Sequence, residues 1–194
     1  MVAAARYTVT LRWTVAMVAG LNVAYFGVEF TVATLIGSVA LFADSVDFLE
    51  DACINGLILI GLGWSAVRRA TLGKVLAFIL LAPGVATIWT AWQHWGSGHV
   101  PAPIPLTLTG LGALIINLCC ALLLARVRHV HGSLTRAAFL SARNDTIANV
   151  AIIAAGGITA LTRSGWPDLI AGLGIFVMNL DAARDVYGAA RRES

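Results

Sequence analysis

Six apolar segments, each about as long as a membrane-spanning helix, account for nearly all of the 194 residues of this chain. A helix needs about 20 predominantly apolar residues to cross the hydrocarbon core of a bilayer. The segments are continuously apolar rather than alternating, which excludes a transmembrane β-barrel as the better interpretation. With 59% hydrophobic and 12% charged residues, the chain has the composition of an integral membrane protein. We therefore predict an all-α polytopic membrane protein with one six-helix domain, residues 1–194.

The predicted helices are separated by short segments rich in glycine, serine, proline or basic residues. Their approximate bounds are 13–35, 39–67, 75–95, 106–127, 137–161 and 169–187. Loops on the cytoplasmic side of a membrane protein are enriched in Lys and Arg. Of the 13 Lys and Arg residues, 11 lie at the two termini or in the second and fourth connections. Both termini are therefore predicted to be cytoplasmic, and the basic excess reports topology rather than nucleic-acid binding.

The second predicted helix carries four carboxylates in the stretch ADSVDFLEDACIN, at Asp44, Asp47, Glu50 and Asp51. A carboxylate at the centre of a spanning helix costs about 2.5–3.5 kcal/mol on insertion scales. Such residues normally face the interior of a bundle and mark an ion path. Asp44, Asp47 and Asp51 share one helix face, where they repel each other unless a cation or proton lies between them. Asp44 and Glu50 could equally serve a structural role, such as a hydrogen bond to a neighbouring helix.

Two further predicted helices carry polar stripes. In the fifth, Ser141, Asp145 and Asn149 recur every four residues, with Asn144 at the edge of the same face. The first contains a stripe at i, i+3 and i+7, formed by Asn22, Tyr25 and Glu29. Each stripe alone could serve hydrogen bonding between helices. Three of them in one small bundle favour a shared hydrophilic centre that binds a cation.

The run NVAYFGVEFTVATLIGSVALFADSVDFLEDA resembles the first two helices of the cation diffusion facilitator family of metal exporters. The family pattern has an Asn and a Glu in helix one, then GS-x-AL-x-AD, then a His or Asp followed four residues later by Asp. The last pair is here Asp47 and Asp51. The run SGWPDLIAGLGIFVMNLDAARDVY is similar to the family's sixth helix and the turn before it. The resemblance implies a six-helix transporter, usually a homodimer, that exchanges a divalent metal ion for protons.

The family's transport site joins two residues of helix two to a His-x-x-x-Asp pair of helix five. Asp47, Asp51 and Asp145 match three of these positions, and Ser141 stands where the family has His. The resemblance therefore implies a metal site at these residues, with Asn144, Asn149 or water as further candidates for the missing ligand. An all-oxygen set of this kind would admit manganese, ferrous iron or cobalt more readily than the usual family site, while zinc also accepts carboxylates.

We expect a divalent-cation efflux transporter, not an enzyme, that exchanges metal for protons as a homodimer in contact with the lipid of a bacterial inner membrane. The alternative is a non-transporting or regulatory homologue that assembles with a partner membrane protein. Two departures from the family motivate it: Ser141, and the end of the chain at Ser194 without a C-terminal cytoplasmic domain. An intramembrane hydrolase built on paired aspartates has no nucleophile signal to support it.

Three remaining features lie in the predicted connections. Trp89, Trp92 and Trp95 recur every three residues at the end of the third predicted helix, as in an aromatic anchor at the membrane interface. His94 and His99 are interpreted as solvated residues of the outer connection. The remaining histidines form at most a weak metal-capture site in the fourth connection, at His129 and His131.

Overall fold

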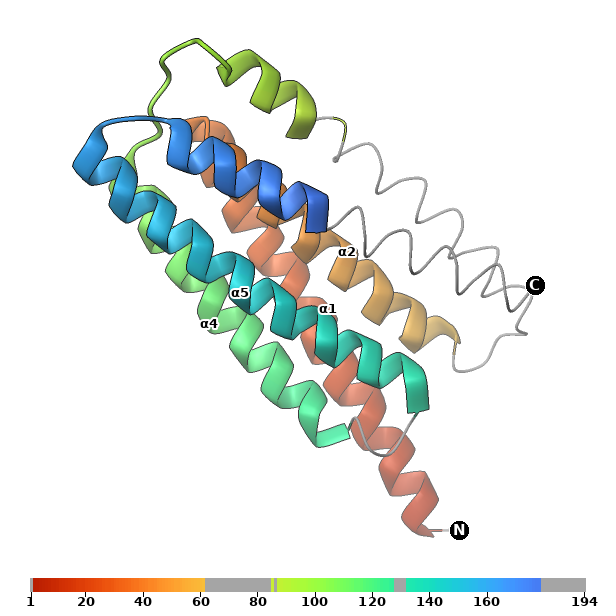
Figure 1. The fold of residues 1–194 in the computed structure, drawn as a ribbon. Coiled ribbons are helices and arrows are strands. Elements are labelled where there is room, and N and C mark those ends of the chain that lie inside the picture. Colours follow the sequence, from red (N-terminus) through yellow and green to blue (C-terminus); the bar gives the residue numbers. More distant parts are fainter. Residues whose placement is uncertain (1, 62–84, 86, 128–131, 179–194) are drawn as a thin grey trace.

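The computed structural model describes residues 2–61, 85, 87–127 and 132–178, and all regular secondary structure in these ranges is helical (Figure 1). The four long helices are α1 (Val2–Ile36), α2 (Val39–Gly61), α4 (Pro103–Val127) and α5 (Gly132–Thr162). Two shorter helical segments cover residues 87–94 and Trp166–Met178. The predicted all-α class is confirmed. Most of the predicted helix 75–95 and the C-terminal part of the predicted helix 169–187 lie outside the described residues.

Helix α1 begins well before the predicted start at residue 13, and α5 before the predicted start at residue 137. Hydropathy marks the part of a helix that crosses the membrane, whereas the helix itself continues until a residue breaks it. Among the described residues, three stretches are long and apolar enough to span a bilayer, namely Leu11–Ile36, Pro103–Arg126 and Asp145–Thr162. Helix α2, with 23 residues, is also long enough, but it carries the four acids.

The bundle buries many polar side chains beside its apolar clusters, and its outer surface is largely apolar. Buried positions include seven Asn, Asp, Glu and Ser side chains of α1 and α2, among them Asn22, Glu29 and Asp44, each 0% exposed. Large apolar side chains instead face outward, such as Leu35 at 79% and Leu161 at 87% exposure. This arrangement is the reverse of a water-soluble domain. It is the arrangement of a polytopic membrane protein, whose apolar surface contacts lipid and whose polar groups are satisfied inside.

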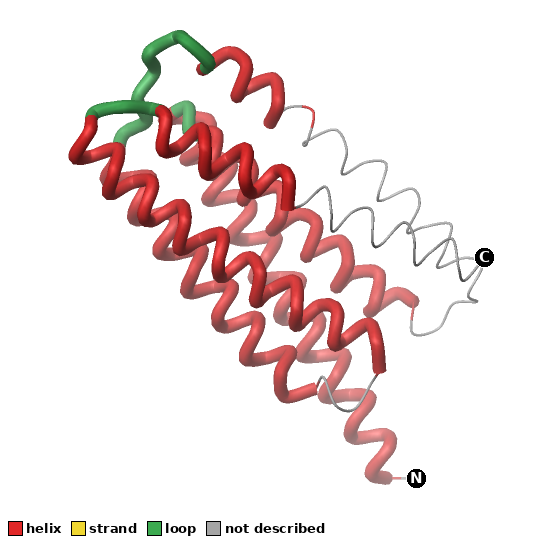
Figure 2. Tube along the Cα trace, viewed as in Figure 1, coloured by secondary structure: helices red, strands yellow, loops and turns green. Residues whose placement is uncertain are grey.

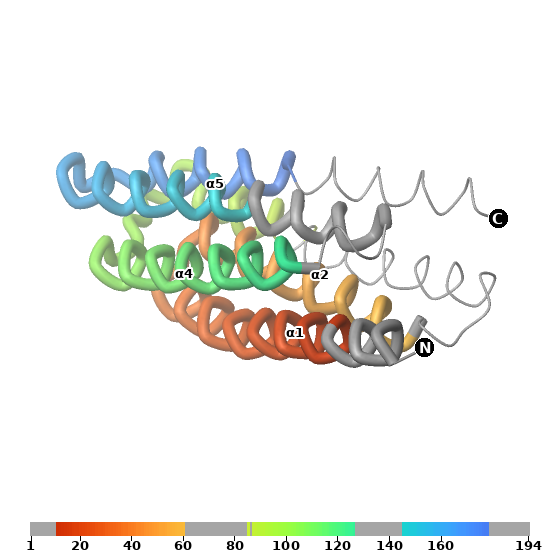
Figure 3. The backbone as a smooth tube through the Cα atoms, turned by 90° about the horizontal axis from the view of Figure 1, so that it is seen from below, coloured from red at the N-terminus to blue at the C-terminus, as the bar shows by residue number. Residues whose placement is uncertain are grey.

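The four long helices form a ring. Helix α1 packs along α2, α4 packs along α5, and the two pairs meet through contacts of α1 with α4 and of α2 with α5. Figure 3, turned by 90° from Figure 1, shows α4 between α1 and α5. Because α2 and α5 are neighbours in this ring, side chains on their inward faces can meet.

Three connections come together at one end of the bundle, which we call the loop end (Figure 2). They are the α1–α2 turn, the connection 95–102 and the connection 163–165. Gly37 in the first turn has φ +64°, a conformation that side-chain-bearing residues rarely adopt. Ser38 then caps α2, because its Oγ accepts a hydrogen bond from the Leu41 amide at 3.1 Å.

Asp168 fixes the beginning of α2 from the far end of the sequence. Its Oδ1 accepts a hydrogen bond from Ser38 Oγ at 2.6 Å, and its Oδ2 accepts one from the Val39 amide at 2.8 Å. A carboxylate at a helix N-terminus satisfies free amides and interacts favourably with the helix dipole. The helix that carries the acids is therefore anchored to the first turn of the helix Trp166–Met178, which follows α5.

The helix Trp166–Met178 approaches α2 closely at Gly172. A Cβ at this position would lie 2.7 Å from the Val39 carbonyl carbon and 2.8 Å from the Ala40 amide nitrogen. Gly174, two residues further on, has nothing within 4 Å of its Cβ position. Glycine at 172 thus allows backbone-to-backbone contact next to the α2 cap.

We predict that Gly172→Ala destabilises the protein and that Gly174→Ala does not. Both substitutions replace a helical glycine by alanine, and this replacement by itself stabilises a helix by about 0.5–1 kcal/mol. Only the first forces a methyl group into backbone atoms, and such overpacking costs about 1–3 kcal/mol. Thermal unfolding of the two purified variants in the same detergent compares them directly. Equal midpoints would contradict the close contact at Gly172.

Candidate cation site

Helix α2 presents three of its acids to the interior of the ring. Asp44, Asp47 and Asp51 are 0%, 8% and 5% exposed, while Glu50 at the edge of this face is only partly buried. The spacing i, i+3, i+7 places them on one face, and the amphipathic character of α2 turns that face inward.

Helix α5 brings a fourth acid to this face. The Asp145 carboxyl lies within hydrogen-bonding reach of the Asp51 carboxyl on α2. Asp47 is close enough to Asp145, and to its own neighbours on α2, for their charges to repel it. Two carboxylates can approach in this way only when a proton or a cation lies between them. The arrangement can therefore bind either one.

An asparagine follows each of the two facing acids by one helical turn. Asn55 Nδ2 donates a hydrogen bond to the backbone carbonyl of Asp51 at 2.8 Å. Asn149 Nδ2 donates one to the backbone carbonyl of Asp145 at 2.7 Å. A carbonyl only accepts, so the nitrogen of each amide must face it. Both Oδ1 atoms are buried and receive no hydrogen bond from a described residue. These two oxygen atoms, near the acids, could therefore serve as metal ligands.

The sequence prediction included Asn149 and missed Asn55. The signal was present, because Asn55 stands four residues after Asp51, just as Asn149 stands four residues after Asp145. Ser141 and Asn144 lie on α5, but their side chains are outside the described part of the chain. Among the side chains described, no three acidic, histidine or cysteine groups converge closely enough to hold a metal ion. The acids lie near one another, but their carboxyl groups do not converge on a single ion position.

A second acidic pair lies beside the first. Glu29 of α1 and Asp44 of α2 are both 0% exposed, and their carboxyl groups are within hydrogen-bonding reach of each other. No described donor reaches any of their four oxygens. Two ionised carboxylates can only accept, so a hydrogen bond between these groups requires a proton on one of them. The hydrogen-bonding role considered for Asp44 thus has a partner on the neighbouring helix.

Tyr25 of α1 contacts both α4 and α2 beside the buried acids. Its hydroxyl donates to the Thr109 carbonyl of α4 at 2.6 Å, and its ring packs on Phe48 with 5.1 Å between centroids. Gly112 makes room for this hydroxyl, because a Cβ there would collide with it. The polar stripe of α1 therefore joins three helices around the acids.

An apolar cluster lies between the acids and the loop end. It joins α1, α2, α4, α5 and the helix Trp166–Met178, through Ala33, Ala40, Leu41, Ala43, Leu106, Ala148, Ile152 and Ile175. Its members on α2 precede Asp44, and its members on α5 follow Asp145, so the cluster is nearer to the loop end on both helices. It separates the acidic centre from the three connections.

Comparison with known proteins agrees with this architecture. The family model of the cation efflux transmembrane domain matches residues 15–188, which include every acid of the polar interior. Comparison with curated proteins found no significant match. Since the family model covers most of the sequence, the chain belongs to the cation efflux family of divalent-cation transporters.

Proposed function

We propose that the chain exports a divalent metal ion through the acidic centre of its bundle, in exchange for protons. The approach of Asp145 on α5 to Asp51 on α2, inside a membrane bundle, carries this proposal. Metal–oxygen bonds need about 2.0–2.6 Å, so ligands on two helices must already be neighbours before an ion can join them. Asp47, one turn before Asp51, supplies the third carboxylate.

The proposed ligand set consists of oxygen atoms. Asp47, Asp51 and Asp145 supply carboxylates, and the uncommitted Oδ1 atoms of Asn55 and Asn149 are further donors. Ser141 and Asn144 remain candidates on α5. Oxygen ligands suit manganese and magnesium, whereas imidazole favours zinc, cobalt and nickel. We therefore infer a substrate range that includes manganese, ferrous iron, cobalt and zinc, with weaker preference for zinc than a histidine-containing site has.

Two features of the bundle support the proposed direction of transport. The loop end contains the first, third and fifth connections, and the distribution of basic residues assigns this side to the exterior. The apolar cluster at Leu41, Leu106 and Ile152 separates the acids from that side. We infer that the ion enters from the cytoplasmic end and leaves after the helices around this cluster move apart. A homodimer in the plasma membrane is the proposed working form.

Protons take the place of the ion in the empty site. A carboxylate must lose its proton before it binds a metal, so binding and protonation exclude each other at the same oxygen atoms. The Glu29–Asp44 pair extends this chemistry along α2, since its single hydrogen bond also requires a proton. Exchange of one ion for protons then avoids leaving several buried carboxylates ionised together.

We predict that Asp145→Asn abolishes metal uptake, whereas Glu50→Gln retains it. Both substitutions remove one negative charge at nearly constant volume, but only Asp145 faces Asp51 across the helices. The expected loss is at least tenfold in metal affinity, or about 1.4 kcal/mol. Uptake into reconstituted vesicles, with and without a pH gradient, measures the effect. Equal activity of the two variants would remove Asp145 from the site, and an inactive wild type would favour the regulatory homologue.

We predict that metal affinity rises with pH. Each proton displaced by the ion adds about a tenfold gain in apparent affinity per pH unit, in the range where that proton is bound to the empty site. Titration of the purified protein with cobalt or manganese between about pH 5.5 and pH 8 tests this. A flat profile would show that proton coupling does not run through the metal-binding carboxylates.

We predict that Ser141→His raises zinc affinity relative to manganese by at least tenfold, or about 1.4 kcal/mol. The new imidazole would stand one turn before Asp145 on the same helix face, and nitrogen ligands favour zinc. Competition binding on the wild type and the variant gives the ratio. Ser141→Ala is the control, because it changes the residue without adding nitrogen. An unchanged ratio in Ser141→His would move the search for the remaining ligand to Asn144, Asn149 or Glu50.

A further inference from the structure

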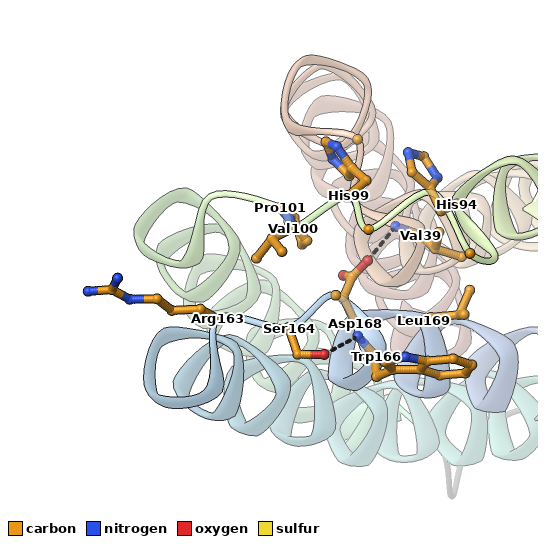
Figure 4. A pocket seen from close by; sticks show the side chains of 14 residues that line it. Val39, His94, His99, Val100, Pro101, Arg163, Ser164, Trp166, Asp168 and Leu169 are labelled. Atoms are coloured by element: carbon orange, nitrogen blue, oxygen red, sulfur yellow. Dashed lines mark hydrogen bonds between the residues drawn. The ribbon is translucent and has the colours of Figure 1, made fainter.

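The loop end contains a cavity of about 210 Å³ that is separate from the acidic centre (Figure 4). Residues of all three connections line it, including Gly37, His94, His99, Trp166 and Asp168. The prediction that both histidines are simply solvated loop residues was incomplete. Each makes a specific contact with the backbone, and their rings lie together at a centroid distance of 4.6 Å.

Hydrogen bonds to backbone carbonyls indicate the tautomer of each ring. His94 Nδ1 lies 2.9 Å from the Thr90 carbonyl, and His99 Nε2 lies 2.9 Å from the Ile36 carbonyl. Because a carbonyl oxygen only accepts, these two nitrogens carry the hydrogen atoms. His94 Nε2 and His99 Nδ1 are then the lone-pair nitrogens of the neutral rings. A histidine that binds metal typically donates its other N–H to a carbonyl or carboxylate in this way.

The spacing of the rings also fits a shared ion. A zinc–nitrogen bond of about 2.0–2.1 Å puts each ring centre roughly 3 Å from the metal, so two rings at one ion have centres about 4.5–5 Å apart. Gly37 leaves space next to the rings. A Cβ at this residue would lie 3.2 Å from His94 Nε2 and 2.6 Å from His99 Nε2. The lone-pair nitrogen of His94 therefore lies next to Gly37, beside the His99 ring.

The electrostatic surroundings favour a cation. Asp168 lines the same cavity, is 2% exposed, and is close enough to His94 for their charges to interact. Its oxygens are occupied by Ser38 and the first amides of α2, so it contributes charge rather than a direct bond. The Arg163 side chain points away from the cavity (Figure 4).

We propose that His94 and His99 form a second metal site, at the loop end, for a divalent transition-metal ion that prefers imidazole nitrogen, with water completing its coordination. The site differs in chemistry from the acidic centre, which has only oxygen donors among its described residues. It does not depend on the acidic centre being the transport site. Since His99 holds the last turn of α1 through Ile36, an ion there would bind next to the turn that leads into α2.

The test uses Cu²⁺ as the probe, because nitrogen ligands split its electron paramagnetic resonance signal. The chain has four histidines, so His129→Ala/His131→Ala leaves His94 and His99 as its only imidazoles. At neutral pH and one equivalent of Cu²⁺, this variant should show coupling to two imidazole nitrogens. Absence of that coupling in this variant overturns the proposal without any change to the loop end.

Further substitutions in the same variant assign the nitrogens. Adding His94→Ala should leave one coupled nitrogen and weaken Cu²⁺ binding at least tenfold, and adding His99→Ala should do the same. Ser164→Ala removes another polar side chain from the cavity lining and should leave both couplings in place. Coupling that persists in His94→Ala/His99→Ala would overturn the assignment. Asp145→Asn should retain the nitrogen signal while losing uptake, so failure of this site and failure of the transport site give different results.

Discussion

The repulsion among buried carboxylates is the interaction on which the rest of this molecule depends. Asp47, Asp51 and Asp145 meet inside a bundle whose outer surface is apolar, where ionised groups lose most of their hydration. Such an arrangement is stable only when positive charge occupies the space between the oxygens. Protons and a divalent cation are the two candidates, and a site that requires one of them would suit the metal–proton exchange that we propose.

The remainder of the bundle positions α2 and α5 so that this repulsion is not relieved by simple separation. Asp168, in the first turn of the helix Trp166–Met178, holds the first turn of α2, and Gly172 allows the same helix to pack against that turn. At the other side of the ring, Gly110 approaches Ile152, which brings α4 against α5. Both acid-bearing helices are thus held at their loop ends, and the proposed release of an ion past the apolar cluster would require these contacts to rearrange.

Periodicity in the sequence predicted the helical class and the helix faces, because burial in a membrane bundle sorts polar from apolar residues with the helical repeat. It could not predict which polar groups meet. Three of these contacts depend on how segments distant in the sequence approach each other. They are the Glu29–Asp44 pair, the hydrogen bond from the Val39 amide to Asp168, and the contact between the His94 and His99 rings. Asn55 had a visible signal, its spacing from Asp51, but the family pattern matched on the second helix has Asp51 as its last ligand position.

Oxygen ligands at the centre and imidazoles at the loop end would give the two sites different metal preferences. Manganese would bind better at the first and copper or zinc better at the second. Conduction requires that each site binds well enough to take up the ion and weakly enough to lose it. A two-imidazole site completed by water meets the second condition, because it lacks the charge of the three carboxylates. If both proposed sites bind an ion, the apolar cluster between them would separate the two until α2 and α5 move, so the order of binding would depend on the bundle and not on affinity alone.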